Sequence, residues 1–303
     1  MGGLAIVGAG GVVGTKLVEQ ALAAFNGPIH AFTHGAIPPH ATADRVSWHS
    51  LDLGDGPAVR RALDAARPET VINTAAMTNV DACETRRDDA LAANGHGPRH
   101  LAEACVRLGA RLLHVSTDYV FPGDAEQPGP YAEDAAARPI NHYGWTKLEG
   151  ERAIVDVCDG RVPWLIARTA LVYGYVPGGR ANFVSWLAGE LRAGRRVRVV
   201  SDQINTPTLA DDLATALLHL MRRGSEGVIH VAGPDLLSRD AWARAIAAYY
   251  SLDAGLIDVT TTAALKQIAP RPLRSGLRTH RAADLEGIHL RGVREGLAAL
   301  PGL

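Results

Sequence analysis

Short apolar runs alternate with longer amphipathic segments along the first half of the chain. Segments such as TKLVEQALAAF and PRHLAEACVRL repeat their apolar residues with the spacing of a helix. Strands that alternate with helices form a parallel sheet covered by helices on both faces. The alternation therefore predicts a doubly wound α/β fold, in which ligands bind beyond the carboxyl ends of the strands. The expected strands occupy residues 4–8, 28–33, 70–73, 111–116 and 164–167.

The pattern changes after residue 170 and predicts a second, smaller lobe. A helix is expected in FVSWLAGELRAG, and short strands are expected near residues 196–200 and 228–232. We therefore predict a first domain over residues 1–170 and a smaller α/β lobe over residues 171–303. A segment of that lobe near residues 195–222, which includes LADDLATALLHLM, is expected to pack back on the first domain.

Composition narrows the function to a local site. The 303 residues are 47% hydrophobic and 21% charged, and the formal net charge is -1. Such a chain has no global field that gathers nucleic acid or an anionic membrane. The three cysteines are far apart and odd in number, which predicts neither a disulfide framework nor a zinc site. With no basic signal segment and no apolar stretch of roughly 20 residues, we expect a soluble protein in the reducing cytoplasm.

Glycines cluster in AIVGAGGVVGTKL, between the first expected strand and the first expected helix. Gly8, Gly11 and Gly14 have the spacing G-x-x-G-x-x-G, whereas the dinucleotide fingerprint G-x-G-x-x-G meets Val13 at its last glycine. A tight turn before a helix presents free amides to an anion, so a diphosphate is the expected ligand. Val12 and Val13 would contribute at the helix start. Taken alone, the cluster fits a plain strand-to-helix turn as an alternative.

Tyr143 and Lys147 stand four residues apart in NHYGWTKLEGE and share one face of the expected helix. A phenol loses its proton near pH 10, which makes it a slow acid at neutrality. A neighbouring ammonium stabilises the phenolate and lowers its pKa. The lysine also has donors for a ribose hydroxyl. Without other signals, a tyrosine and a lysine on the surface of an amphipathic helix would explain this spacing equally well.

Polar and small residues follow two of the expected strands. LLHVSTDYVF ends its apolar run at Thr117, whose hydroxyl can bind a substrate carbonyl and position it for hydride attack. Its neighbour Ser116 is the alternative for that role. In TVINTAAMTNVDACE, Ala75 and Ala76 would let a dinucleotide lie close to the backbone.

Further segments complete a pattern that spans nearly the whole chain. After the glycine loop come VINTAAMTNVDACE, AANGHGPRHLA, VSTDYVF, PYAED, PINHYGWTKLEGE, RTALVYG, ANFV, DQINTPTLADDLA and APRPLRSGL. In order, spacing and content they resemble the extended short-chain dehydrogenase/reductase family, and within it the dTDP-4-dehydrorhamnose reductase branch. The resemblance implies a Rossmann-type NAD(P)-binding domain over residues 1–170 and a substrate-binding lobe over residues 171–303. It also favours the phosphate cradle over the plain turn.

The implied reaction is hydride transfer from a nicotinamide cofactor to the C4 ketone of a nucleotide-linked deoxysugar. Thr117 would orient the carbonyl, Tyr143 would protonate the alkoxide, and Lys147 would bind the nicotinamide ribose and lower the pKa of the tyrosine. Met77, Pro122 and DQINTPT depart from the usual motifs, which leaves the identity of the sugar open. Candidates for substrate binding, carried over from matching motifs, are Asn182, Gln203, Thr206 and Arg271, with Arg274 as a further diphosphate ligand.

The expected cofactor is NADPH, with NADH as a second donor. In many dehydrogenases an acidic residue after the second strand binds the adenosine ribose and repels a 2'-phosphate. PIHAFTHG instead places Thr33 and His34 there, which permits the phosphate. Asp52 in SLDLGD is suited to accept a hydrogen bond from the adenine amino group, and its neighbour Leu53 and the loop residue Met77 complete the expected cofactor site.

Two other functions fit the same segments. A nucleotide-sugar epimerase or dehydratase would keep its cofactor bound, and Asp118 after Thr117 fits a dehydratase, although the adjacent glutamate common in such enzymes is missing. A regulatory subunit resembling the methionine adenosyltransferase beta subunit would bind the cofactor without turnover. The resemblance also allows a homodimer. No catalytic metal, nucleic acid or membrane partner is predicted.

Overall fold

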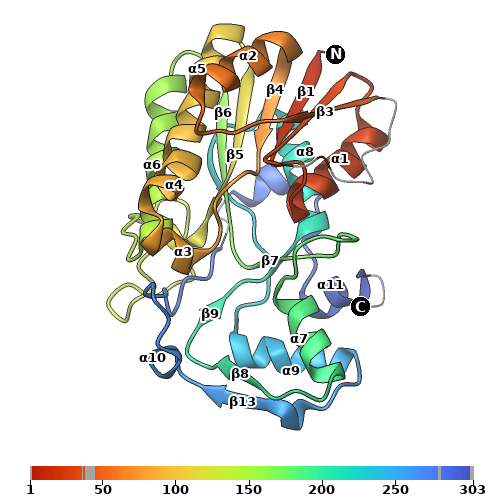
Figure 1. Ribbon diagram of the computed structural model, residues 1–303, viewed down its shortest axis with the longest axis vertical. Coiled ribbons are helices and arrows are strands. Elements are labelled where there is room, and N and C mark those ends of the chain that lie inside the picture. Colours follow the sequence, from red (N-terminus) through yellow and green to blue (C-terminus); the bar gives the residue numbers. More distant parts are fainter. Residues whose placement is uncertain (1, 36, 38–44, 279–280, 301–303) are drawn as a thin grey trace.

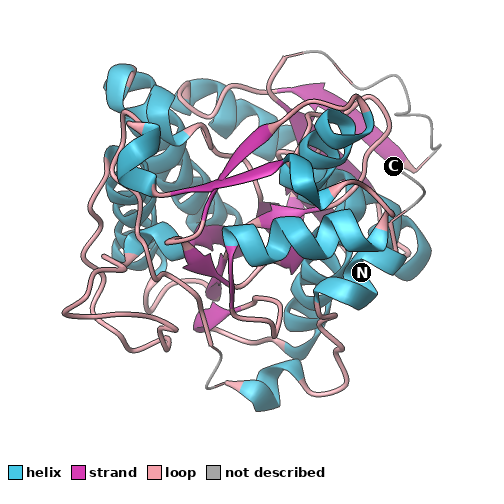
Figure 2. Cartoon of the chain, turned by 90° about the horizontal axis from the view of Figure 1, so that it is seen from below, coloured by secondary structure: helices cyan, strands magenta, loops and turns pink. Residues whose placement is uncertain are grey.

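A parallel sheet of seven strands forms the centre of the molecule (Figures 1 and 2). The structure is a computed structural model that describes residues 2–35, 37, 45–278 and 281–300. The strand order is β11-β6-β5-β4-β1-β2-β3, so the chain winds outward in both directions from the neighbours β1 and β4. This confirms the predicted doubly wound fold, and in such folds ligands bind where the strand order reverses, here at the carboxyl ends of β1 and β4. The strands are β1 (Gly3–Val7), β2 (Ile29–Thr33), β3 (Val46–Ser50), β4 (Pro68–Asn73), β5 (Arg111–Thr117), β6 (Trp164–Thr169) and β11 (Gly227–His230).

Helices cover both faces of this sheet (Figure 1). On one face α1 (Val12–Ala24) packs against α8 (Ala210–Arg223), and on the other α5 (Gly97–Leu108) lies between α2 (Gly56–Ala66) and α6 (His142–Cys158). The short helices α3 (Val80–Thr85) and α4 (Arg87–Leu91) and a π-helical turn (Ala92–His96) precede α5. None of the helices in the described part of the chain is long and apolar enough to cross a membrane.

Strand β1 shows why the sheet needs continuous apolar runs. Its side chains alternate between two hydrophobic clusters, with Leu4 and Ile6 on the side of α1 and α8 and Ala5 and Val7 on the side of α2 and α5. All four side chains are buried. A strand covered on both faces must be apolar at every position, which explains why its sequence lacks the polar–apolar alternation of a half-exposed strand.

A smaller lobe lies beyond the carboxyl ends of the strands (Figure 1). Its core joins Tyr173, Leu187, Trp242 and Ile246, and all four are buried. Four residues of β8 pair in parallel with β13, and four two-residue strands form two further pairs, β7 with β10 and β9 with β12. Its elements are β7 (Val172–Tyr173), α7 (Phe183–Arg192), β8 (Val197–Val200), β9 (Ile204–Asn205), β10 (Thr208–Leu209), β12 (Leu237–Ser238), α9 (Arg239–Tyr249), β13 (Ile257–Thr260), α10 (Thr262–Leu265) and α11 (Val293–Ala298).

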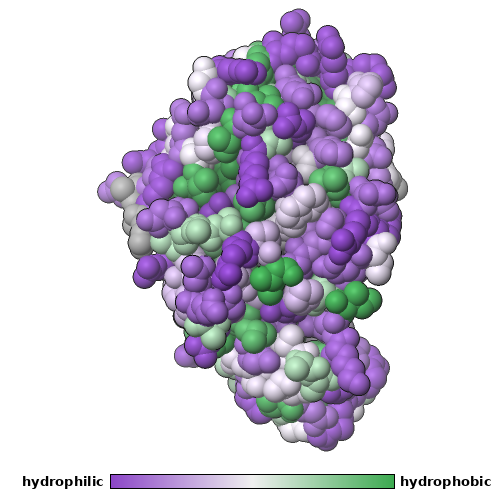
Figure 3. Space-filling model, turned by 90° about the vertical axis from the view of Figure 1, so that its left-hand side faces the viewer, coloured by the Kyte–Doolittle hydropathy of each residue, from purple (hydrophilic) through white to green (hydrophobic). Residues whose placement is uncertain are grey.

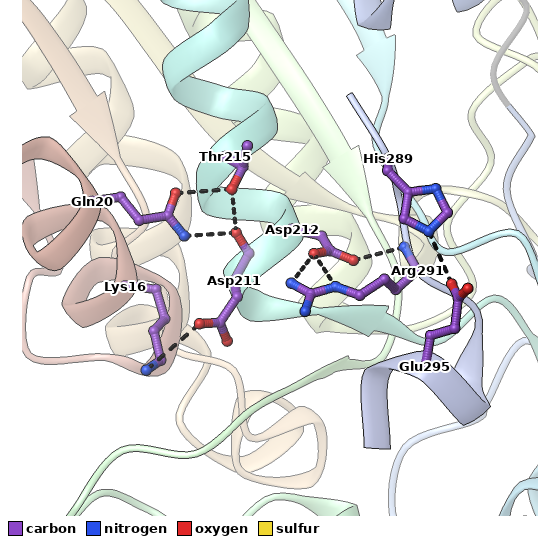
Figure 4. A network of polar contacts seen from close by, with 8 residues as sticks. All are labelled: Lys16, Gln20, Asp211, Asp212, Thr215, His289, Arg291 and Glu295. Carbon is purple, nitrogen blue, oxygen red and sulfur yellow. Dashed lines mark hydrogen bonds and ion pairs between the residues drawn. The ribbon is translucent and has the colours of Figure 1, made fainter. Parts of the chain in front are cut away.

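The chain crosses between the two regions more than once. The strand expected near residues 228–232 is β11, which pairs with β6 in the central sheet and not in the smaller lobe. Its residue Ile229 is fully buried in the central sheet. Helix α8 contacts α1 through Gln20, whose amide donates to the carbonyl oxygen of Asp211 at 2.9 Å and accepts from Thr215 at 3.0 Å (Figure 4). Strand β8, in contrast, stays in the smaller lobe.

Candidate active site

The glycine loop is held tightly between β1, α1 and the end of β4. Gly8 has a φ of 82°, and a Cβ atom at this position would lie 2.6 Å from the backbone nitrogen of Ala75. A Cβ atom at Gly14 would lie 2.1 Å from the carbonyl oxygen of Gly8. The N-terminus of α1 at Gly11 has no side-chain cap and no acidic residue in its first turn. Uncapped amides at a helix start are the arrangement that binds phosphate, so the loop fits a dinucleotide.

Helix α6 is docked so that Tyr143 lies beside Thr117. The side chain of Asn141 caps the helix by accepting from the backbone nitrogen of Gly144 at 2.8 Å. A Cβ atom at Gly144 would lie 2.1 Å from the carbonyl oxygen of Tyr119, so this glycine lets the helix lie directly on the turn after β5. Burial raises the pKa of Tyr143 above its ordinary value, and a hydrogen bond with the Thr117 hydroxyl opposes that rise.

Lys147 is buried one helical turn after Tyr143. Its Nζ atom donates to the carbonyl oxygen of Val115 at 2.8 Å and lies 3.0 Å from Nε2 of His114, and only 1% of the residue is exposed. Burial lowers the pKa of Lys147 to about 8, although the charge of Glu151 acts in the opposite direction. The helical spacing of four residues therefore places a phenol and a lysine amine at the carboxyl end of β5, as predicted.

Asp118 is buried next to Thr117 and is enclosed by hydrogen bonds. Its Oδ1 accepts from the Thr117 hydroxyl at 3.1 Å, and its Oδ2 accepts from Asn205 at 3.3 Å and from the Ser275 hydroxyl. Burial raises the pKa of Asp118 to about 6, and the hydrogen bonds from Ser275 and Thr117 oppose that rise. This carboxyl is bound to the protein on both oxygens and connects β5 to the smaller lobe.

The sequence matches the family model described as RmlD substrate binding domain over residues 2–301. The chain belongs to this family. A dTDP-4-dehydrorhamnose reductase of Mycobacterium tuberculosis is 36% identical over 301 residues, which cover 97% of this chain and 91% of that protein. One of Streptomyces griseus is 40% identical over 261 residues, covering 83% and 84%. The crystal structure of dTDP-4-dehydrorhamnose reductase from Bacillus anthracis in complex with NADP superposes with a TM-score of 0.82 at 28% identity, covering 98% of each chain.

In this member of the family, most of the predicted cofactor residues line the carboxyl edge of the sheet. The loop after β4 carries Ala75, Ala76 and Met77, and it is fixed because the backbone nitrogen of Met77 donates to Asn94 at 2.8 Å. Thr33 is buried at the end of β2, and His34 is exposed directly after it. After β3, the exposed Asp52 accepts from the backbone nitrogen of Gly54 at 2.8 Å, while Leu53 is buried.

The predicted substrate residues already have partners within the chain. Asn182 caps α7 by accepting from the backbone nitrogen of Val184 at 3.0 Å. Gln203 donates to the Thr262 hydroxyl at 3.0 Å, and the Thr206 hydroxyl accepts from the backbone nitrogen of Leu277 at 3.1 Å. Arg271 forms an ion pair of 3.0 Å with Asp81, and its side chain is 9% exposed. Each of these four side chains therefore has a partner within the chain, and its contact with the substrate stays a prediction.

Four side chains near the site were missed by the sequence analysis. Asn94 lies in the π-helical turn and joins the Met77 loop to Thr146 of α6 by a hydrogen bond of 3.1 Å. A π-helical turn within a helix is common at functional sites, but the sequence gives no periodicity that predicts one. His114 and Asn73 lie behind Lys147 and are paired by sheet register. The fourth is Arg239.

Arg239 begins α9 in the smaller lobe. Its guanidinium lies 4.8 Å from the ring centroid of Phe183 and 5.6 Å from that of Trp242. Within the described residues it forms no hydrogen bond or ion pair through its side chain, in contrast to Arg271. Burial lowers the pKa of Arg239, while Tyr119 and Asp118 act in the opposite direction. Within the same residues, no group of three or more histidine, cysteine, aspartate or glutamate side chains is placed to hold a metal ion.

Proposed function

We propose that this protein is an NADPH-dependent reductase of a nucleotide-linked 4-keto-6-deoxysugar, with dTDP-4-dehydrorhamnose as its substrate and NADH as a second donor. The observation that carries the proposal is the arrangement of Thr117, Tyr143 and Lys147 at the carboxyl end of β5, on the same edge of the sheet as the glycine loop after β1. Membership of the RmlD family and the names of its relatives support the same reaction.

The cofactor would lie across the carboxyl edge of the sheet. The diphosphate would meet the uncapped amides of α1 at Val12 and Val13, which is the stabilising position for an anion at a helix start, while the amide of Gly11 donates to the carbonyl oxygen of Gly8 at 2.9 Å. Asp52 and Leu53 would hold the adenine. No acidic side chain stands at Thr33 or His34 to repel a 2'-phosphate, which favours NADPH over NADH.

A bound reduced nicotinamide supplies the hydride. Thr117 would turn its hydroxyl proton from Asp118 to the oxygen of the sugar ketone, and Tyr143 would give its phenolic proton to the oxygen that becomes negative. Because burial raises the pKa of Tyr143, the phenol holds its proton until that charge develops. Lys147, when charged, would lower the pKa of the phenol and donate to the nicotinamide ribose. The chain would thus couple hydride arrival to proton delivery at one carbonyl.

The smaller lobe would hold the sugar nucleotide. Arg239 lies near Tyr119 and Asp118 and forms no ion pair among the described residues, so we assign the diphosphate of the substrate to it ahead of Arg271. Asn182, Gln203 and Thr206 would act from the lining of the lobe. Gln203 is 6% exposed and Thr206 is 2% exposed, so their contribution is to position the backbone that meets the sugar.

The test is oxidation of NADPH, and then of NADH, by the purified protein with dTDP-4-dehydro-6-deoxy-L-mannose generated in place. Tyr143→Phe removes the proton donor and is expected to reduce kcat by at least about a hundredfold. Tyr249→Phe, at an exposed tyrosine of α9, is the matched control and should retain full activity. Binding of NADPH without oxidation would contradict the proposal and favour a regulatory role. Tightly bound oxidised cofactor would favour an epimerase or dehydratase.

The hydrogen bonds that Asp118 accepts argue against the dehydratase alternative. A dehydratase acid must reach the sugar, but both carboxylate oxygens of Asp118 accept hydrogen bonds from protein groups. The smaller lobe supplies two of these donors, Asn205 and Ser275. Asp118 would therefore orient Thr117 and fasten the lobe, and it would not transfer protons to the substrate.

We propose a reducing cytoplasmic location and a homodimer as the assembly. All three cysteines are buried and none is in a disulfide.

The face that carries α5 and α6 is mostly hydrophilic, with hydrophobic residues in separate small groups (Figure 3). On α6, Trp145 is 39% exposed and Val155 is 36% exposed. Light scattering of the wild type and of Trp145→Glu tests whether this helix carries a dimer interface.

A further inference from the structure

A buried histidine that the proposed reaction does not use lies directly behind the lysine of the site. His114 is fully buried in β5, with Nε2 at 3.0 Å from Nζ of Lys147 and Nδ1 at 2.9 Å from Nδ2 of Asn73. Asn73 occupies the paired position on the neighbouring strand β4. Both ring nitrogens therefore have a single partner each, and these partners determine where the ring carries its proton.

The orientation of Asn73 follows from the backbone. Its Oδ1 accepts from the backbone nitrogen of Ala75 at 3.0 Å, and a backbone N–H can only donate. The opposite orientation would set the amide NH2 against that N–H. The NH2 group therefore faces His114 and donates to Nδ1, so Nδ1 must be unprotonated. A neutral imidazole with a free Nδ1 carries its proton on Nε2.

That proton points at the lysine. An ammonium has three donors and no lone pair, so it cannot accept from Nε2–H, whereas a neutral amine can. We propose that His114 is a positioning residue which holds Lys147 as a neutral amine in the free protein, so that the lysine takes up one proton from solvent when the cofactor binds. The proton adds to the lone pair of Nζ. The contact with Nε2–H is then lost, and the new ammonium donates to the carbonyl oxygen of Val115 and to the cofactor.

The charged and titratable groups around Lys147 agree with this arrangement. Burial lowers the pKa of Lys147 to about 8, so above that pH the lysine of the free protein is mostly the neutral amine, and burial lowers the pKa of His114 well below its usual range. Glu151, one turn further along α6, forms a buried ion pair of 2.7 Å with Arg168 of β6, so its charge is already matched. Tyr143, one turn earlier, is a neutral phenol. A dinucleotide would bring the first unmatched negative charge to the lysine, which explains why protonation would accompany its binding.

The inference rests on the proposed nicotinamide site, but its first test does not depend on it. Long-range proton–nitrogen NMR of the free protein identifies the tautomer of each histidine, and His114→Gln assigns the signal by its loss. We expect the proton of His114 on Nε2. A proton on Nδ1, or a doubly protonated ring, would overturn the proposal whether or not the protein is a reductase.

The second test measures protons taken up on NADPH binding by calorimetry in buffers of different ionisation enthalpy. At about pH 8.5, above the ionisation of the cofactor phosphate, the wild type should take up roughly 0.5–0.8 proton per NADPH. Lys147→Met should take up none. His114→Gln places an amide oxygen where Nε2 stood, so the lysine would be charged already and uptake should fall below roughly 0.2 proton. His289→Gln, at an exposed histidine, is the control.

The same change should appear in the pH profile. The pH at which kcat/KM for NADPH declines on the alkaline side should rise by roughly one unit in His114→Gln, because the free lysine then keeps its proton to higher pH. If His114 only fills space, His114→Gln would lower the Tm but would change neither the alkaline limb of the pH profile nor the proton uptake. Wild-type binding with no proton exchange between about pH 7.5 and 9.5 would overturn the inference, and failure to reduce a sugar would leave it intact.

Discussion

Arg271 and Arg239 carry the same charge but have different neighbouring side chains. Arg271 is matched by Asp81, whereas the Arg239 side chain has aromatic neighbours and no acidic partner in the part of the chain that the structure describes. A cation held on aromatic rings and left unpaired is suited to a ligand with negative charge. The choice between the two residues therefore depends on pairing, which only the folded chain reveals.

Arg239→Gln is expected to raise the KM for the nucleotide sugar by roughly tenfold or more, because a hydrogen bond to a charged group is lost. The KM for NADPH should not change. Arg244→Gln, an exposed position on the same helix α9, is the matched control for charge and helix content. Steady-state kinetics with each substrate varied in turn measures both constants. Equal KM values for the sugar in the two variants would show that Arg239 does not bind the substrate.

At the scale of elements, the loop between β1 and α1 depends on close backbone contact. Gly14→Ala would set a Cβ atom 2.1 Å from the carbonyl oxygen of Gly8, so we expect a loss of unfolding free energy of about 1–3 kcal/mol or more. At Gly11 the same atom would meet that oxygen at 3.3 Å, and Gly11→Ala should cost less than about 1 kcal/mol. Urea unfolding without cofactor compares them. Equal losses would mean that the loop does not need this close approach.

The sequence predicted those strands and helices that a local pattern of apolar residues specifies. The apolar runs predicted the inner strands of the sheet, and the four-residue spacing placed Tyr143 and Lys147 on one face of α6. Position within the sheet was not local: β11 was expected in the smaller lobe but pairs with β6. His114 was missed for the same reason, because its contact with Asn73 depends on the register of β5 against β4. Such pairs form between segments that the sequence keeps far apart.

At the scale of the whole molecule, the two regions share a core. Helix α8 belongs to the second half of the chain, but its Leu213 and Leu217 join the cluster that contains Leu4 and Ile6 of β1. Asp212 of the same helix is tied to Arg291 near the C-terminal end (Figure 4). The proposed boundary at residue 170 therefore marks where the sheet gives way to the lobe, and it does not mark where two independent folding units meet.

A fragment of residues 1–170 should not fold by itself. Removing α8 and β11 would expose the α8-facing side of the sheet and leave β6 as an unpaired edge, which costs more than an isolated domain of this size can lose. Circular dichroism during thermal unfolding should show no cooperative transition for the fragment and one for the full chain. A cooperative transition of the fragment, with native helix content, would mean that the first domain is autonomous.

We propose that this chain moves hydride from the nicotinamide to C4 of a keto sugar and then releases both products. The most direct test uses NADPH with deuterium at both hydrogen positions of the nicotinamide C4, with dTDP-4-dehydro-6-deoxy-L-mannose as substrate, and locates the label by mass spectrometry and NMR. We expect one deuterium at C4 of the product sugar and one equivalent of free NADP for each sugar reduced. A product sugar without deuterium, or oxidised cofactor that stays tightly bound to the protein, would contradict this reaction.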